Sequence, residues 1–159
     1  MINLFEVARR LSEANVDYVI VGGIAIRSHG GNYVTEDLDI CYSRTNDNLK
    51  KLADVLTPLN PRPRNFPEDL TYRFDWTTLQ HGTNFTFSTS MGAVDLLGEV
   101  KPIGSYDDLV AESIRVDLDG YPTYILSISA LIAAKRHAGR PKDEAGLIIL
   151  EALKEAENK

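Results

Sequence analysis

The chain has 159 residues, of which 43% are hydrophobic and 25% are charged, and its formal net charge at pH 7 is −6. This length suits one domain with its own core, so we expect a single domain over residues 1–159. The acidic balance argues against broad non-specific binding to nucleic acid, although a local basic patch remains compatible with it.

Cysteine and histidine usage, together with hydropathy, excludes several other classes. The single cysteine, Cys41, rules out an intramolecular disulfide framework and is expected to be a small buried residue, and the three histidines lack zinc-ligand spacing. No apolar run approaches the roughly 18 residues of a membrane span. Residues 1–6 lack the basic start and apolar middle of a signal peptide. We therefore expect a cytoplasmic protein with no membrane partner.

Hydrophobic periodicity and turn-forming residues divide the first half of the chain into helices and short strands. The run before Gly22 is almost entirely apolar, as in a buried central strand. A segment with four prolines, 58–67, then predicts a stiff loop. The expected elements are a helix over 3–14, a strand over 16–21, a helix over 22–28, a strand over 37–42 and a helix over 45–59.

The second half of the chain gives hairpin signals followed by helices. Asp119 and Gly120 are the strongest hairpin turn in the sequence. A serine at 127 or 129 caps a helix that Gly139 ends, and Pro141 begins the last helix. The expected elements are a helix over 67–79, strands over 84–90 and 93–97, a helix over 106–112, strands over 115–118 and 121–126, and C-terminal helices over 127–157.

Gly22 and Gly23 follow the first predicted strand directly. Glycines at the start of a helix allow backbone N–H groups to approach an anion such as a phosphate closely. The alternative is a tight strand-to-helix turn that binds nothing. Neither a Walker A motif nor G-x-G-x-x-G is present, so the P-loop and Rossmann interpretations fail.

Asp37 and Asp39 lie on the next predicted strand, separated by Leu38. Because successive strand side chains alternate faces, both carboxylates point one way while Leu38 and Ile40 point into the core. Aspartate is depleted in strands, and two adjacent carboxylates repel unless a cation lies between them. The pair therefore indicates a divalent cation site, and the alternative is a solvated strand end.

Asp95, on the second strand of the predicted hairpin, is the third candidate carboxylate. By itself it is compatible with a polar residue on the outer face of that hairpin. Next to Asp37 and Asp39 it could complete a metal site and accept a proton from an attacking hydroxyl.

This combination resembles the nucleotidyltransferase superfamily typified by DNA polymerase β and kanamycin nucleotidyltransferase. The family pattern is a hydrophobic residue, Gly-Gly or Gly-Ser, a gap of about a dozen residues, and Asp-h-Asp/Glu-h, where h is hydrophobic. Here 13 residues, 24–36, separate Gly23 from Asp37. The stretches 95–99 and 135–143 resemble small prokaryotic members, including the minimal and AbiEii-type toxin-like nucleotidyltransferases. The likeness covers residues 3–155.

The resemblance implies an α/β (α+β) fold with a small mixed sheet flanked by helices. It also implies a site in which Asp37, Asp39 and Asp95 bind two Mg²⁺ ions and an NTP is the substrate. Gly22 and Gly23 would seat the β- and γ-phosphates. Asp95 would help to deprotonate the acceptor hydroxyl, which attacks the α-phosphate as pyrophosphate leaves.

Basic residues near the C-terminus are candidates for holding the triphosphate. Cations at a helix C-terminus are also favoured by its dipole, so this cluster has an equally simple structural interpretation. Arg27 and Thr35 are further candidates near the two motifs. The candidate nucleotide-binding residues are Gly22, Gly23, Arg27, Thr35, Lys135, Arg140 and Lys142.

The sequence leaves the acceptor open among a small molecule, a tRNA and a protein. Two other roles stay in view: a toxin paired with an antitoxin, and a catalytically inactive nucleotide-binding or interaction module of the same fold. A homodimer partner is also an expectation, since 159 residues leave little room for a separate acceptor-binding domain.

Overall fold

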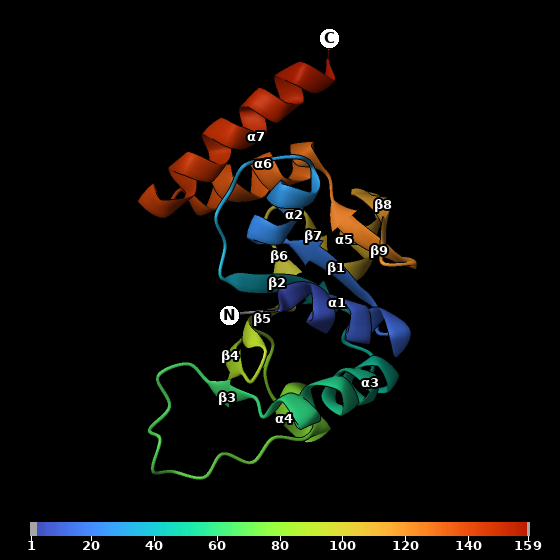
Figure 1. Ribbon diagram of the computed structural model, residues 1–159, viewed down its shortest axis with the longest axis vertical. Helices are drawn as coiled ribbons and strands as arrows, with labels where there is room; N and C mark the ends of the chain where they lie inside the picture. Colours follow the sequence, from blue (N-terminus) through green and yellow to red (C-terminus); the bar gives the residue numbers. More distant parts are fainter. Residues whose placement is uncertain (1–2, 159) are drawn as a thin grey trace.

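A seven-stranded mixed sheet runs through the molecule, and the computed structural model describes it within residues 3–158 (Figure 1). The strand order is β3-β4-β5-β2-β1-β9-β8, and β6 and β7 form a separate two-stranded ribbon. The strands are β1 (Tyr18–Val21), β2 (Asp37–Tyr42), β3 (Arg62–Pro63), β4 (Phe85–Thr89), β5 (Gly92–Leu97), β6 (Glu99–Val100), β7 (Gly104–Ser105), β8 (Ser113–Leu118) and β9 (Tyr121–Leu126).

Helices cover the sheet and extend beyond its two ends. α6 packs on α7 and both contact α2 at one end, while α3 packs on α4 at the other (Figure 1). The helices are α1 (Leu4–Glu13), α2 (Gly22–Ser28), α3 (Asn46–Leu56), α4 (Trp76–Gln80), α5 (Tyr106–Ala111), α6 (Ile128–Ala138) and α7 (Glu144–Glu157), with 3₁₀ turns η1 (Thr57–Leu59) and η2 (Pro141–Asp143). The expected mixed sheet flanked by helices is confirmed.

Strand pairing at the centre of the sheet is both parallel and antiparallel. β1 pairs antiparallel with β2 and parallel with β9, and β2 pairs parallel with β5. β1 is buried at all four positions, as its apolar sequence predicts. In β2, Leu38 and Ile40 have no exposed surface, whereas Asp37 and Asp39 are on the opposite, partly exposed face. The alternation predicted from the sequence is therefore confirmed.

Cys41 follows these residues on β2 and lies in the core with no exposed surface. Burial, with a smaller contribution from the nearby charge of Glu99, raises the pKa of its thiol to about 12. A thiol with such a pKa remains protonated at neutral pH and is a poor nucleophile.

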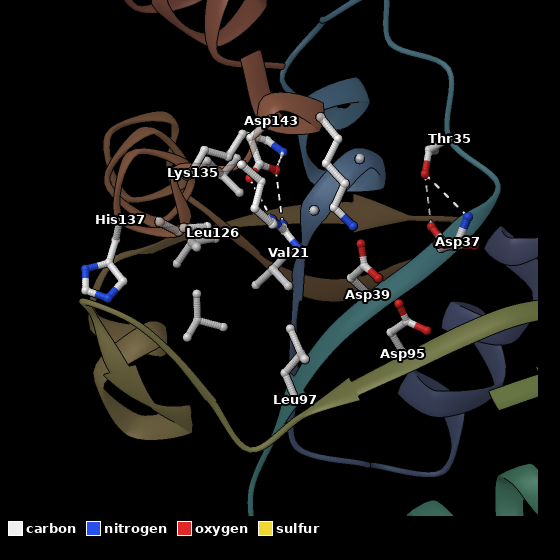
Figure 2. A pocket seen from close by; sticks show the side chains of 18 of the residues that line it. Val21, Thr35, Asp37, Asp39, Asp95, Leu97, Leu126, Lys135, His137 and Asp143 are labelled. Carbon is white, nitrogen blue, oxygen red and sulfur yellow. Dashed lines mark hydrogen bonds and ion pairs between the residues drawn. The ribbon is translucent and has the colours of Figure 1, made fainter. Parts of the chain in front are cut away.

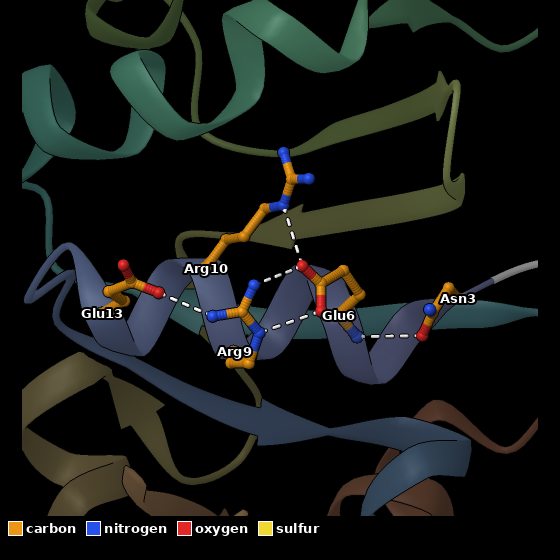
Figure 3. A network of polar contacts seen from close by, with 5 residues as sticks. All are labelled: Asn3, Glu6, Arg9, Arg10 and Glu13. Carbon is orange, nitrogen blue, oxygen red and sulfur yellow. Dashed lines mark hydrogen bonds and ion pairs between the residues drawn. The ribbon is translucent and has the colours of Figure 1, made fainter. Parts of the chain in front are cut away.

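The polar face of α1 is held by a chain of charged contacts (Figure 3). Asn3 caps the helix by accepting from the backbone N–H of Glu6 at 3.1 Å. Arg9 and Arg10 both donate to the Glu6 carboxylate, and Arg9 also reaches Glu13 at 2.7 Å. The hydrogen bonds from the two arginines hold the pKa of Glu6 at about 2. These contacts lie on the polar face of the helix, while Leu4, Val7, Ala8 and Leu11 are buried on its apolar face.

The turn at Asp119 and Gly120 connects β8 and β9, as predicted. Both residues have positive φ, 49° and 88°, which is the backbone geometry of a type I′ hairpin turn. Asn15 also has a positive φ, of 60°, and follows the end of α1 where the sequence predicts a stop.

The prediction of a helix over 67–79 is wrong for most of its length. Only α4, from Trp76, is helical, and the residues before it are irregular. Aromatic side chains in this segment instead pack on the buried ring of Phe87, with ring centroids 5.5 Å away for Phe74 and 6.4 Å for Tyr72. The prediction also missed β3, which lies within the proline-rich segment at the sheet edge, where Pro63 is tolerated.

Among residues 3–158, no helix is long and apolar enough to cross a membrane.

Asn48, in the first turn of α3, ties that helix to the end of β2 and the start of β1. Its side chain is only 2% exposed. It accepts from the backbone N–H of Asp17 at 2.7 Å and donates to the carbonyl oxygens of Asp17 and Ser43 at 3.1 and 2.8 Å. The amide of Asn48 therefore contacts three backbone groups, of which the Asp17 carbonyl also accepts from the backbone N–H of Ser43 at 3.1 Å.

Asn48→Ala should lower the free energy of unfolding by about 2–3 kcal/mol, because it removes a buried amide together with its three hydrogen bonds to the backbone. Urea denaturation checks this. Asp54→Ala, at an exposed position of the same helix, is the control and should change stability by less than about 0.5 kcal/mol. Equal effects of the two substitutions would contradict the assignment.

Candidate active site

Three carboxylates converge where β2 and β5 lie side by side. The parallel register places Asp39 directly opposite Asp95, and Asp37 lies two residues earlier on the same face of β2. One oxygen from each carboxylate lies within 4.8 Å of the others. Figure 2 shows Asp39 and Asp95 projecting into the same space. The structure therefore brings together all three of the predicted carboxylates.

The diglycine motif lies directly against this cluster. Val21, the last residue of β1, is opposite Asp39, so Gly22 begins α2 next to the Asp39 side chain. Gly22 has a φ of 69°, and a methyl group on it would overlap the Asp39 carboxylate. A methyl group on Gly23 would lie 2.6 Å from the side chain of Thr35. Both glycines are thus required for the close approach of α2 to the carboxylates.

The electrostatics of Asp39 reflect this crowding. Burial raises the pKa of its carboxyl to about 6, and the neighbouring charge of Asp37 acts in the same direction. The positive charges of Arg64, Lys135 and Lys142 act in the opposite direction and only partly offset it. Any further positive charge beside a carboxyl group with a raised pKa would stabilise its ionised form.

The three carboxylates suit a divalent metal. Carboxylate oxygens are the preferred ligands of Mg²⁺, which commonly binds one or two of them together with substrate phosphates. Gly22 keeps the space beside the Asp39 carboxylate free, because a side chain at this position would occupy it. Asp37, Asp39 and Asp95 are therefore the residues that could hold the metal.

Cationic side chains from α6 and η2 form the wall opposite the carboxylates. Asp143 is buried, with its side chain 3% exposed, and it pairs with Lys135 at 3.3 Å and with Arg140 at 2.8 Å. Burial tends to raise the pKa of Asp143, but the hydrogen bonds from Arg140 and Lys135 outweigh it and keep that pKa low. Lys142 also lines the cavity.

The carboxylates and the cations face one another across an open cavity of about 880 Å³ (Figure 2). Its acidic end is bounded by Asp39 and Asp95. Its far end is more apolar and is lined by Leu97, Leu126 and His137. The cavity thus has an acidic end, a cationic wall and an apolar end.

Two further sequence candidates differ in their placement. Thr35 lines the cavity, and its hydroxyl donates to the backbone carbonyl of Asp37 at 3.2 Å, so it shapes the start of β2. Arg27 is exposed on α2 and is not among the residues that line the cavity. The structure therefore does not bring Arg27 together with the other candidates.

Sequence reasoning did not find three residues of the site. Arg64, which follows β3, forms ion pairs with Asp95 and with Asp37, the latter at 3.8 Å. Asp143 orients the two cations, and the ring of Tyr33 lies 5.9 Å from Lys135 Nζ. The run of basic residues in 135–143 was a signal for Asp143, whereas nothing in the local sequence marked Arg64.

Solved structures are similar to the fold of this protein over nearly the whole chain. The antibiotic-resistance factor ANT(2'')-Ia, in complex with adenylyl-2''-tobramycin, has a TM-score of 0.58 at 16% identity, over 96% of this chain and 93% of that one. A Thermotoga maritima protein described as a nucleotidyltransferase has a TM-score of 0.56 at 16% identity, over 99% and 96%. This chain has the nucleotidyltransferase fold.

Another protein with the nucleotidyltransferase fold is an antigenic nucleotidyltransferase-like protein from Paracoccidioides brasiliensis, with a TM-score of 0.58 at 18% identity. The match covers 94% of this chain and 72% of that one. No protein-family model matches the chain, and no curated protein sequence does. At these identities the shared property is the fold, and the chemistry has to be argued from the site.

The raised pKa of Asp39 predicts a pH-dependent cost in stability. Because this pKa, about 6, lies above the ordinary value of 3.8, the folded chain binds more protons between these values and its free energy of unfolding falls as pH rises. Without divalent cations, Asp39→Asn should therefore be more stable than the wild type at pH 7.5 by about 1–2 kcal/mol. The difference should vanish near pH 4 in urea titrations, and a difference independent of pH would contradict this.

Gly22→Ala tests the close approach of α2 to the carboxylates. Gly120→Ala is a matched control, because Gly120 also has a positive φ but has open space around it. Both substitutions should lose about 1–2 kcal/mol of stability from the backbone conformation. Only Gly22→Ala should also weaken Mn²⁺ binding, at least tenfold, when measured by calorimetry. Equal Mn²⁺ affinity in the two variants would separate Gly22 from the site.

Proposed function

We propose that this chain transfers a nucleoside monophosphate from an NTP to a hydroxyl group in a Mg²⁺-dependent reaction. The observation that carries this proposal is the convergence of Asp37, Asp39 and Asp95 beside Gly22. The opposing wall of cations supports it, because a triphosphate needs positive charge around it in a protein of net charge −6.

In this proposal the three carboxylates hold two Mg²⁺ ions, as the family resemblance implies. When bound, the metal neutralises phosphate charge and lowers the pKa of the attacking hydroxyl. The backbone N–H groups of Gly22 and Gly23 receive the β- and γ-phosphates. Lys135, Arg140 and Lys142 balance the remaining phosphate charge and orient the triphosphate.

Asp95 has the further role of proton acceptor. Its carboxylate takes the proton from the acceptor hydroxyl as that oxygen forms a bond to the α-phosphorus. The bond between the α-phosphorus and the bridging oxygen to the β-phosphate breaks, and pyrophosphate leaves. The apolar end of the cavity, near Leu126 and His137, is then available for the nucleoside.

The acceptor we favour is a small molecule that carries a hydroxyl group. The structure of ANT(2'')-Ia contains adenylyl-2''-tobramycin, and this chain matches 93% of that protein's length. The two proteins share the fold over nearly the whole of both chains, which supports a comparable acceptor. Because NTPs are cytoplasmic metabolites, the proposal also assigns the activity to the cytoplasm.

The alternative of an inactive module is not favoured, because three carboxylates in one cluster repel each other and metal binding gives all three a common role. A tRNA or protein acceptor, and with it a toxin paired with an antitoxin, would be recognised by where the label goes in the experiment below. Growth arrest on expression would accompany a toxin role.

The test is incubation of the protein with labelled NTPs and Mg²⁺, together with a cell lysate or aminoglycosides. Label should move to a small molecule and pyrophosphate should accumulate. Asp39→Asn should reduce this turnover by at least about a thousandfold, since it removes a ligand that every step needs. Asp54→Asn, on the exposed surface of α3, is the control with full activity. Unchanged turnover in Asp39→Asn would remove the catalytic assignment.

A further inference from the structure

Arg64 reaches the acidic site because of the way the edge of the sheet is paired. β3 pairs with β4, and the backbone N–H of Arg64 extends this pairing by donating to the carbonyl oxygen of Thr86 at 2.9 Å. Thr86 is opposite Asp95, which in turn is opposite Asp39. Opposite residues in neighbouring strands project from the same face, so these four residues form one row across the sheet. The backbone register, more than a chance rotamer, directs Arg64 to the carboxylates.

The guanidinium of Arg64 occupies the space between two of the three carboxylates. Its Nη2 donates to Asp95 Oδ1, and its Nη1 lies 3.8 Å from Asp37 Oδ2. Its charge also acts on Asp39. Arg64 therefore pairs with two of the three carboxylates that could otherwise bind a divalent cation.

One hydrogen-bond donor of the Arg64 guanidinium, Nε, is buried and has no acceptor among residues 3–158. A buried donor without a partner costs free energy, so charge attraction holds the side chain in place without full hydrogen bonding. The side chain is nevertheless 32% exposed, which gives its charged end a route to water. A ligand with more charge than a guanidinium could displace it.

We propose that Arg64 and a divalent cation compete for Asp37 and Asp95, so that Arg64 must turn away before the metal site is filled. This inference rests on the proposed function, since it concerns how the same site is loaded. Arg64 then acts as a built-in counter-ion that keeps the three carboxylates together when no metal is bound. It also sets a threshold for the cation concentration at which the site fills.

The movement required is a rotation of one side chain. The Arg64 backbone remains paired with Thr86, and the following irregular segment leads away from the site (Figure 1). Arg62 holds this segment by donating to the carbonyl oxygens of Pro67 and Leu70, each at 2.8 Å. The segment therefore has its own anchor, which does not depend on the contact of Arg64 with the carboxylates.

The test titrates Mn²⁺ into the whole chain without nucleotide and reads free Mn²⁺ by electron paramagnetic resonance. Arg64→Gln removes the competing charge and should bind Mn²⁺ about tenfold more tightly than the wild type, the scale expected for one adjacent charge near a protein surface. Arg64→Lys retains the positive charge but lacks the planar guanidinium that contacts two carboxylates at once. This variant should therefore bind Mn²⁺ severalfold more tightly than the wild type. Arg73→Gln, exposed in the same segment, should bind as the wild type does.

The melting temperature is a second measurement, and substitution of a residue that does not contact the carboxylates should leave it unchanged. In EDTA, Arg64→Gln should melt several degrees below the wild type, because the carboxylates lose their cation. Saturating Mn²⁺ should close this gap, since the metal then supplies the charge in both proteins. Arg73→Gln should show neither effect.

The outcomes separate this inference from the proposed function. Equal Mn²⁺ affinity of the wild type and Arg64→Gln, with binding lost in Asp39→Asn, would overturn the competition and leave the proposed function standing. Absence of Mn²⁺ binding to all of these proteins would overturn both. If Arg64→Gln does not fold, Arg64→Lys decides the matter, and an unchanged dissociation constant in that variant would overturn the competition.

Discussion

The parallel pairing of β2 with β5 is the constraint on which the rest of the site depends. It sets Asp39 directly beside Asp95 near the centre of the sheet, and the spacing within β2 adds Asp37. Burial of Asp39, together with the charge of Asp37 beside it, opposes folding, as the raised pKa of Asp39 indicates. The surrounding structure reduces this cost with positive charge, from Arg64 on one side and from the C-terminal helices on the other.

The cationic wall depends on a single buried acid. Asp143 connects η2 to α6 through Lys135 and also holds Arg140, so the two cations have defined positions before any substrate arrives. Gly146 contributes as well, because a side chain there would meet the stem of Lys135 at 2.8 Å. Positioning of this kind lowers the entropy cost of binding an anion. The C-terminal helices are therefore part of the site as much as part of the fold.

Features that depend on neighbouring residues could be predicted from the sequence, whereas contacts between distant segments could not. The alternation in β2 follows from two-residue periodicity, and the turn at Asp119 and Gly120 follows from local backbone preference, so both were predictable. The partnership of Asp39 with Asp95 depends on which strands pair, and here only the family resemblance pointed to it. Arg64 follows a two-residue edge strand, too short to carry any periodic signal.

The helix over 67–79 was predicted incorrectly for a related reason. Tyr72, Phe74 and Trp76 recur every second residue, which is not a helical period, and Tyr72 and Phe74 pack on Phe87 from an irregular backbone. Tertiary packing overrides local preference where a segment has one strong hydrophobic anchor. No periodic pattern within this segment indicates that its aromatic side chains will pack on a strand that follows later in the chain.

The burial of Cys41 has a practical consequence for spectroscopy. It is the only cysteine of the chain, and its protonated, inaccessible thiol leaves the native protein inert to maleimide reagents. A cysteine introduced on the irregular segment after β3 would therefore be the single labelling point for a spin probe or a fluorophore. The motion of that segment could be followed in solution without first engineering a cysteine-free background.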